Sequence, residues 1–161
     1  MMVLVGLGNP GKEYKNTRHN AGFNLVETLV AADKEISGAK PAKKFDSELW
    51  LGQVTILAKP QTYMNDSGVA VRQILNYFAH FKQQPRQALE HLYVAHDDLD
   101  IQLGAYKIQF GKGPKIHNGL LSIYRHLGSD QFWHVRLGVD NRAGDRSLPG
   151  HAYVLQPFRP A

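Results

Sequence analysis

Residues 1–22 read MMVLVGLGNPGKEYKNTRHNAG, and this stretch determines the fold that we expect. Its apolar run at residues 2–7 is typical of a short buried strand, and the turn-forming residues 8–11 follow it directly. A polar loop comes next, and then a helical pattern begins. Open α/β sheets keep their functional residues at the carboxyl ends of their strands. We therefore expect Asn9 and His19 at such an edge, where a histidine can act as a general base near neutral pH.

The rest of the chain continues this alternation of strands and helices. Apolar residues at helical spacing predict helices over residues 20–34, 68–80 and 118–127, the second capped by Asp66 or Ser67 and the third ended by Gly128. Apolar or alternating runs predict strands over residues 45–51, 53–59, 91–95, 105–110 and 133–139, with a turn at Gly52, a loop over 111–116 and an irregular tail from Asp140. These elements predict the α/β class: one domain over residues 1–161, a three-layer sandwich whose mixed, mostly parallel twisted sheet is flanked by helices.

The composition restricts the possible environments of the protein. The chain of 161 residues contains no cysteine, which excludes disulfides and favours a cytoplasmic setting. No apolar run approaches the roughly 18 residues that a membrane span needs, and no basic leader precedes the first apolar run, so we expect neither a membrane protein nor a signal peptide. The net charge of +5 is compatible with a polyanionic partner and equally with a basic surface that keeps the protein soluble.

The glycines of the first turn match the dinucleotide-binding pattern G-x-G-x-x-G at Gly6, Gly8 and Gly11. That pattern requires a helix that opens within the glycines, so that its N-terminus can receive a pyrophosphate. Here a polar loop intervenes, and the acidic residues Glu27 and Asp33 lie in the helical region rather than after a second strand. A nucleotide-dependent oxidoreductase is therefore the weakest of the functions considered.

Residues 91–100, the predicted strand over 91–95 and the polar residues that follow it, contain two histidines and three aspartates. Their spacing matches no zinc pattern, and His91 and His96 fall on opposite faces of the predicted strand, so we expect no metal and no other cofactor. Asp97, just past the predicted strand end, is better placed to orient a histidine. Because the chain lacks cysteine and a G-x-S-x-G motif, a water molecule activated by His19 is the simplest hydrolytic scheme.

Three asparagines, Asn9, Asn65 and Asn118, stand at ends of predicted elements. A single asparagine in such a place usually serves a turn or a cap. Three of them could instead converge on one cleft, where neutral amides both donate and accept hydrogen bonds and suit the recognition of an ester and a peptide.

Five segments occur in an order and spacing that resemble one known family: VGLGNPGKEYKNTRHNAGF, KPQTYMNDSG, VAHDDLD, HNGL and FWHVRLGV. They are similar to the segments of bacterial-type peptidyl-tRNA hydrolases and cover most of the chain up to about Asp140. The resemblance implies an enzyme of translation and ribosome rescue that cleaves the ester between a peptide and the 3′ end of tRNA. It also implies a metal-independent hydrolase with tRNA as its partner. The sequence leaves the oligomeric state open, and a monomer is the default expectation.

The resemblance implies a role for each matching residue. His19 would be the general base that activates water, Asp97 would hold its tautomer, and Asn9 would help to distinguish peptidyl-tRNA by contacting the peptide. Other matching residues would bind the substrate: Asn65 and Asn118 near the ester with Met64 beside them, Tyr14 and Tyr63 at the tRNA 3′ end, and Lys107 and Arg136 at phosphates.

The chain departs from the family pattern in three places. Pro114 and Ile116 stiffen a loop that is normally rich in glycine, while Lys112 and Lys115 add charge to it. Gln109 stands where a basic residue is common, and the sequence ends at residue 161, apparently without the family's further C-terminal helix. These departures keep an alternative open, a catalytically impaired module on the same fold that binds tRNA or another RNA.

Overall fold

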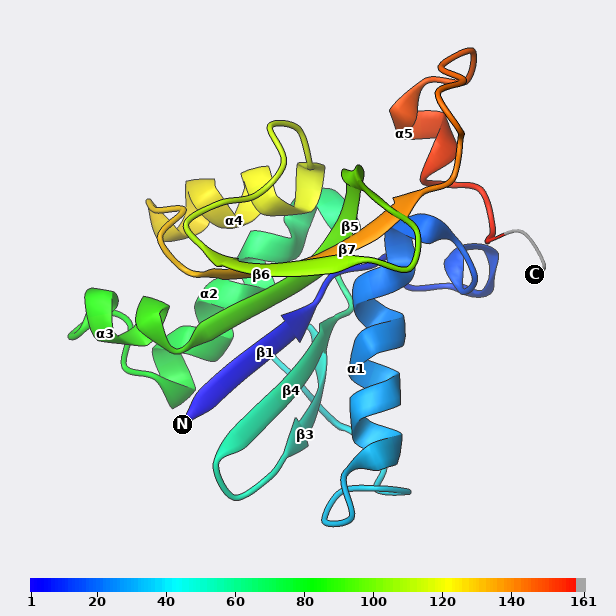
Figure 1. The fold of residues 1–161 in the computed structure, drawn as a ribbon. Helices are drawn as coiled ribbons and strands as arrows, with labels where there is room; N and C mark the ends of the chain where they lie inside the picture. The colour runs from blue at the N-terminus through cyan, green and yellow to red at the C-terminus, as the bar shows by residue number, and fades with distance from the viewer. Residues whose placement is uncertain (159–161) are drawn as a thin grey trace.

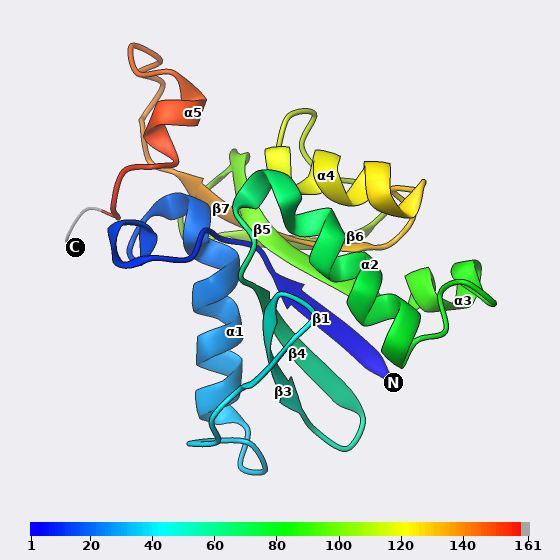
Figure 2. The ribbon, with the colours of Figure 1, turned by 180° about the vertical axis from the view of Figure 1, so that it is seen from behind.

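The computed structural model describes residues 1–158 and arranges them in one seven-stranded mixed sheet with helices on both faces (Figure 1 and Figure 2). The predicted fold class is thus confirmed. The strands are β1 (Met2–Gly6), β2 (Ala42–Lys44), β3 (Ser47–Leu51), β4 (Thr55–Pro60), β5 (Leu92–Gln102), β6 (Tyr106–Phe110) and β7 (Trp133–Asp140). The helices are α1 (Ala21–Ala32), α2 (Ser67–Phe78), α3 (Pro85–Glu90), α4 (Asn118–Leu127) and α5 (Gly150–Tyr153), with short 3₁₀ turns η1 (Lys12–Tyr14), η2 (Arg18–Asn20) and η3 (Met64–Asp66).

The sheet has the strand order β2-β3-β4-β1-β5-β7-β6. Its centre consists of the four parallel strands β4, β1, β5 and β7, and β2, β3 and β6 join through antiparallel pairings. The parallel neighbours β1 and β5 run in the same direction, and β1 ends at Gly6 opposite Ala95 while β5 continues to Gln102. The carboxyl end of β1 therefore opens beside β5, on the side of the sheet where open α/β folds form their sites.

Alternating side chains of β1 divide the core between the two faces of the sheet. Val3 and Val5 belong to the larger buried cluster, which α2 and α4 cover, while Leu4 belongs to a smaller cluster with Val26 of α1. This period of two is what a strand buried on both faces requires, and it accounts for the continuous apolar run of the sequence.

Glycines bring the start of α1 against the end of β1. A Cβ atom on Gly6 would lie 2.1 Å from the carbonyl oxygen of Gly22, so only two glycines permit this approach. Backbone hydrogen bonds then run from Leu7 N to the Ala95 carbonyl and from Phe23 N to the Leu7 carbonyl. The loop after β1, the turn before α1 and strand β5 are therefore held side by side.

Strand β5 is longer than predicted. The expectation that the strand ends before His96, leaving Asp97 just beyond it, was wrong, because β5 continues to Gln102. It pairs with β7 in one register as far as Asp98, and the register shifts between Asp98 and Gln102. Asp97 pairs with Leu137 and Asp98 with Gly138, and both aspartates are buried. Hydrogen bonds satisfy both carboxylates, so these polar side chains can be buried. The buried part of β5 that they occupy therefore shows no apolar pattern in the sequence.

Several smaller elements differ from the sequence predictions. The strand expected from residue 45 begins at Ser47, because Phe45 and Asp46 adopt positive φ and form the turn after β2. The expected side-chain cap of α2 does not form, since the Ser67 hydroxyl donates to the Met64 carbonyl instead. The tail from Asp140 contains α5, and its residues 159–161 lie outside the described part of the chain. Within residues 1–158, no helix has the length and apolar character that crossing a membrane requires.

Candidate active site

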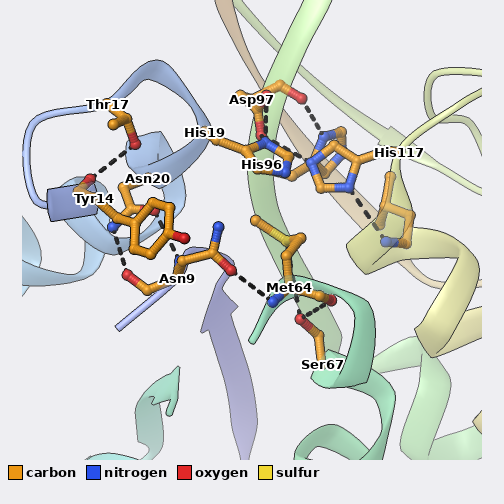
Figure 3. A network of polar contacts seen from close by, with 11 residues as sticks. Asn9, Tyr14, Thr17, His19, Asn20, Met64, Ser67, His96, Asp97 and His117 are labelled. Carbon is orange, nitrogen blue, oxygen red and sulfur yellow. Dashed lines mark hydrogen bonds and ion pairs between the residues drawn. The ribbon is translucent and has the colours of Figure 1, made fainter. Parts of the chain in front are cut away.

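The candidate site lies just beyond the end of β1 and beside the middle of β5, and side chains from η2, η3 and the start of α4 face one another there (Figure 3). At its centre the carboxylate of Asp97 on β5 accepts hydrogen bonds from two imidazoles, those of His19 and His117. The pairing of His19 with Asp97 was predicted from the sequence, whereas His117 had no predicted role.

His19 belongs to η2, directly before α1, and its side chain is 12% exposed. Its Nδ1 lies 2.9 Å from each carboxylate oxygen of Asp97. A carboxylate only accepts hydrogen bonds, so Nδ1 carries the proton and donates it. The other ring nitrogen, Nε2, is then left with its lone pair, which is the state that a general base needs.

His117 is the residue that caps the N-terminus of α4. Its Nδ1 accepts a hydrogen bond of 3.3 Å from Leu120 N, and its Nε2 donates to Asp97 over 2.8 Å. The helix N-terminus therefore fixes the tautomer of His117 and directs its N–H at Asp97. The signal in the sequence was the position of a histidine immediately before a predicted helix start.

The two histidines determine the charge state of Asp97. Burial by itself would raise the pKa of this carboxyl, but the charges and hydrogen bonds of His117 and His19 outweigh it and hold the pKa well below its ordinary value. Asp97 is thus an anion under neutral conditions, and it can both orient His19 and stabilise the imidazolium that forms when His19 takes a proton.

His19, Asp97 and His117 are also the group of described residues whose possible metal-ligating atoms all lie within 4.8 Å of one another. Both facing nitrogens donate to the Asp97 carboxylate in the arrangement described above. As donors they direct their protons at the carboxylate, so the three side chains form one hydrogen-bonded network.

Asn9 is held at the end of β1 by hydrogen bonds on both its backbone and its side chain. Its backbone N–H and carbonyl bond to the side chain of Asn20, over 2.8 and 2.9 Å. Its Oδ1 accepts from Met64 N over 2.7 Å, which leaves the Nδ2 amide pointing to the side on which His19 lies (Figure 3). Asn20, which sequence analysis did not single out, is therefore the residue that fixes Asn9.

The other predicted substrate residues surround this centre. Met64 is buried, and its sulfur packs so closely on α4 that a Cβ atom on Gly119 would lie 2.5 Å from it. Asn65 directly follows Met64 and Asn118 directly precedes Gly119, and both asparagines are exposed. Tyr14 is half-buried, and Tyr63 is 60% exposed. The roles of these residues in substrate binding stay predictions.

The two residues predicted to contact phosphate differ in accessibility. Lys107 on β6 is exposed and pairs in register with Arg136 on β7. Arg136 is buried, its Nε donating to Asp98 over 2.7 Å and its Nη1 to Gln109 over 2.7 Å. Gln109, which stands where a basic residue is common, therefore accepts one of the hydrogen bonds that the Arg136 guanidinium could donate to a phosphate.

The face of β5 and β7 that lies beneath α4 buries two further histidines, His96 and His134. The pKa of His96 is lowered to about 3, chiefly by desolvation and also by the positive charges that His117 and His134 can carry. The hydrogen bond between Nδ1 and the Asp97 carbonyl acts in the opposite direction and raises the pKa. No polar group of residues 1–158 is within hydrogen-bond distance of its Nε2. A second proton would therefore be both desolvated and unpaired.

This histidine makes the protein sensitive to acid. The pKa of this imidazole is 6.5 in the unfolded chain and about 3 in the folded chain. Between pH 6.5 and pH 3 the imidazole is therefore protonated in the unfolded chain and neutral in the folded one. Stability is then lost as the pH falls through this window, by about 1.4 kcal/mol per pH unit for one proton. We expect His96→Phe to lower this slope in urea unfolding between about pH 6.5 and pH 4. The exposed His91→Phe is the matched control, and equal slopes in all three proteins would contradict the assignment.

The chain is similar to known proteins over nearly its whole length. A family model described as peptidyl-tRNA hydrolase matches residues 3–161. The chain belongs to the peptidyl-tRNA hydrolase family. Peptidyl-tRNA hydrolases of Synechococcus sp. (strain JA-3-3Ab) and Akkermansia muciniphila are 39% and 37% identical, over 100% and 98% of this chain and 68% and 77% of the relatives. The enzyme of Cupriavidus necator is 40% identical over 98% of the chain and 80% of its own length.

A solved structure extends the similarity to three dimensions. The crystal structure of peptidyl-tRNA hydrolase from Acinetobacter baumannii superposes with a TM-score of 0.78 at 35% sequence identity. The similarity covers 99% of this chain and 77% of that protein. The shared family thus applies to the whole of the described fold.

Proposed function

We propose that the protein hydrolyses the ester bond that joins a peptide to the 3′ end of tRNA, releasing free tRNA and the peptide. The observation that supports this most directly is the His19–Asp97 pair, with Nδ1 2.9 Å from both carboxylate oxygens and the donor amide of Asn9 on the same side of the site. A base, the group that orients it and a neutral amide donor are what hydrolysis of an ester by water requires.

The reaction proceeds through water rather than through an enzyme nucleophile. Nε2 of His19 takes a proton from water while the water oxygen attacks the ester carbonyl carbon, and Asp97 stabilises the resulting imidazolium. The bond from that carbon to the ribose oxygen then breaks, and the imidazolium returns its proton to this oxygen. The products are tRNA with a free hydroxyl and a peptide with a free carboxylate.

The remaining candidate residues position the substrate in this proposal. Asn9 donates through Nδ2 to the peptide, and Asn65 and Asn118 flank the ester with Met64 packed beside them. Tyr14 and Tyr63 offer aromatic faces on which the unpaired bases of the tRNA 3′ end can stack. Lys107 contacts phosphate directly. Arg136 is held by hydrogen bonds to Asp98 and Gln109 in the free protein, so it contacts phosphate only after its hydrogen bond to Gln109 breaks.

The protein acts in this proposal as a single monomeric domain over residues 1–161. The cytoplasm is the proposed compartment, which the absence of cysteine from the chain favours. Its partner is tRNA in the peptidyl form, and the positive net charge of +5 favours association with this polyanion.

Hydrolysis of an N-acetylated aminoacyl-tRNA tests the proposal, with the unblocked aminoacyl-tRNA compared in parallel. We expect cleavage of the blocked substrate alone, unchanged by EDTA, and well above the spontaneous rate measured without enzyme. Salt-dependent binding of tRNA without cleavage would contradict the proposal and identify the chain as an RNA-binding module.

A further inference from the structure

The turn that carries His19 is held by a segment from the far end of the described chain. His19 N donates to the Val154 carbonyl over 2.7 Å, and Arg18 N donates to the Gln156 carbonyl over 3.1 Å. An isolated bridge joins Thr17 to Pro157. Three successive residues before α1 thus take their backbone position from residues 154–157.

Tyr153 fastens this segment to the sheet. Its side chain is buried, and its hydroxyl donates to the Val139 carbonyl over 3.0 Å while accepting from Asn141 N over 2.9 Å. Both partners lie at the carboxyl end of β7 or directly after it. The ring is therefore fixed relative to the same sheet edge on which Asp97 lies.

Tyr153 also holds Arg18, the neighbour of His19. The Arg18 guanidinium lies 3.8 Å from the ring centroid, and its Nη1 donates to the Tyr153 carbonyl over 3.1 Å. Arg18 is only 2% exposed, and no carboxylate of residues 1–158 forms an ion pair with it. The ring face and the carbonyl are thus the groups that stabilise this buried cation.

We propose that Tyr153 is a positioning residue for the general base, which acts on His19 through Arg18 and through the Val154 carbonyl. Asp97 orients the His19 ring, but it does not fix the backbone from which the ring projects. A buried cation that loses its aromatic partner must move toward water, and Arg18 would carry His19 with it. This inference rests on the proposed function, since it assumes that His19 is the base.

The kinetic test compares two substitutions of Tyr153. Tyr153→Leu removes the ring face, and we expect kcat per folded molecule to fall about 100-fold with little change in KM, the effect of a base displaced by about 1 Å. Tyr153→Phe keeps the ring face against Arg18 and loses the two hydrogen bonds of the hydroxyl, so it should lower kcat far less than Tyr153→Leu, by about threefold. Tyr124→Leu in α4 is the matched control, since this half-buried tyrosine packs on Phe132 and should keep kcat.

A substitution of Arg18 tests the same proposal in case the Tyr153→Leu variant does not fold. Arg18→Lys keeps the charge but loses the planar group that stacks on the ring and bonds to the carbonyl, so it should lower kcat in the same way. If both variants fold and keep the wild-type kcat, or if they change KM alone, the proposal is overturned.

Proton NMR separates this inference from the proposed function. The Nδ1 proton of His19, which is donated to Asp97, should be resolved in the wild type and broadened by exchange with water in Tyr153→Leu, while the Nε2 proton of His117 stays sharp. A merely structural role would leave both signals alike in the folded variant, and that result would overturn the inference. Absence of hydrolysis by the wild type would instead defeat the proposed function, and the NMR comparison would still decide whether Tyr153 positions His19.

Discussion

His19→Ala is expected to lower kcat for an N-acetylated aminoacyl-tRNA by about 1,000-fold, because Nε2 of His19 accepts the proton of the attacking water in the proposed mechanism. General bases contribute about 10²–10⁴-fold, and this one acts without a covalent nucleophile that could continue in its absence. Single-turnover hydrolysis at saturating enzyme measures the change directly.

The control for this substitution is His91→Ala, which removes an exposed histidine just before β5. It should keep wild-type activity, and both variants should bind tRNA with the affinity of the wild type. Turnover that persists in His19→Ala would mean that another group activates the water, and the mechanism proposed above would then be wrong.

Asp97→Asn is expected to lower kcat by about 100- to 1,000-fold while it leaves the shape of the site intact. The asparagine oxygen can still accept from His117, whose tautomer the N-terminus of α4 fixes. The new NH₂ group then faces Nδ1 of His19, where a carboxylate oxygen accepted before. Nδ1 then faces, at equal distance, this donor and the one oxygen that is left, which His117 also uses. The donor favours the tautomer with the lone pair on Nδ1 and the proton on Nε2, which is the wrong one for a base.

Asp100→Asn on the same strand supplies the control, since Asp100 is exposed. It should leave kcat unchanged. Measuring kcat and KM for both variants separates a wrong tautomer from weak binding: the former lowers kcat alone, whereas a rise in KM with normal kcat would argue that Asp97 contacts substrate instead.

Hydrophobic periodicity predicted the elements that form the core and position the site. Residues 2–7 and the helical spacing after Asn20 fixed β1 and α1, because these elements bury an apolar surface that the sequence displays openly. From their connection alone, Asn9 and His19 could be placed at one edge of the sheet. The short elements β2, α3 and α5 were not predicted, since each has too few residues to show a repeating pattern of apolar side chains.

The parts of the site that sequence analysis missed depend on contacts distant along the chain. His117 meets Asp97 across 20 residues, and Arg18 meets Tyr153 across 135. Asp97 was expected beyond a strand end because its buried carboxylate looks like a loop residue when its two histidine partners are unknown. The local sequence around a buried polar residue does not show which distant residue will bond to it. Neither the length of β5 nor the contact of His117 with Asp97 could therefore be derived from local patterns.

The union of residues 154–157 with the turn before α1 also has a consequence for how the enzyme forms. A contact across 135 residues closes almost the whole chain into a loop, and such closures come late in folding because their entropy must be lost before the contact gains anything. The same contact is a natural point for local opening, in which the end segment detaches while the sheet stays intact. Catalytic competence is then acquired after the core has formed and is lost before the core unfolds, so that activity and folding respond separately to denaturant.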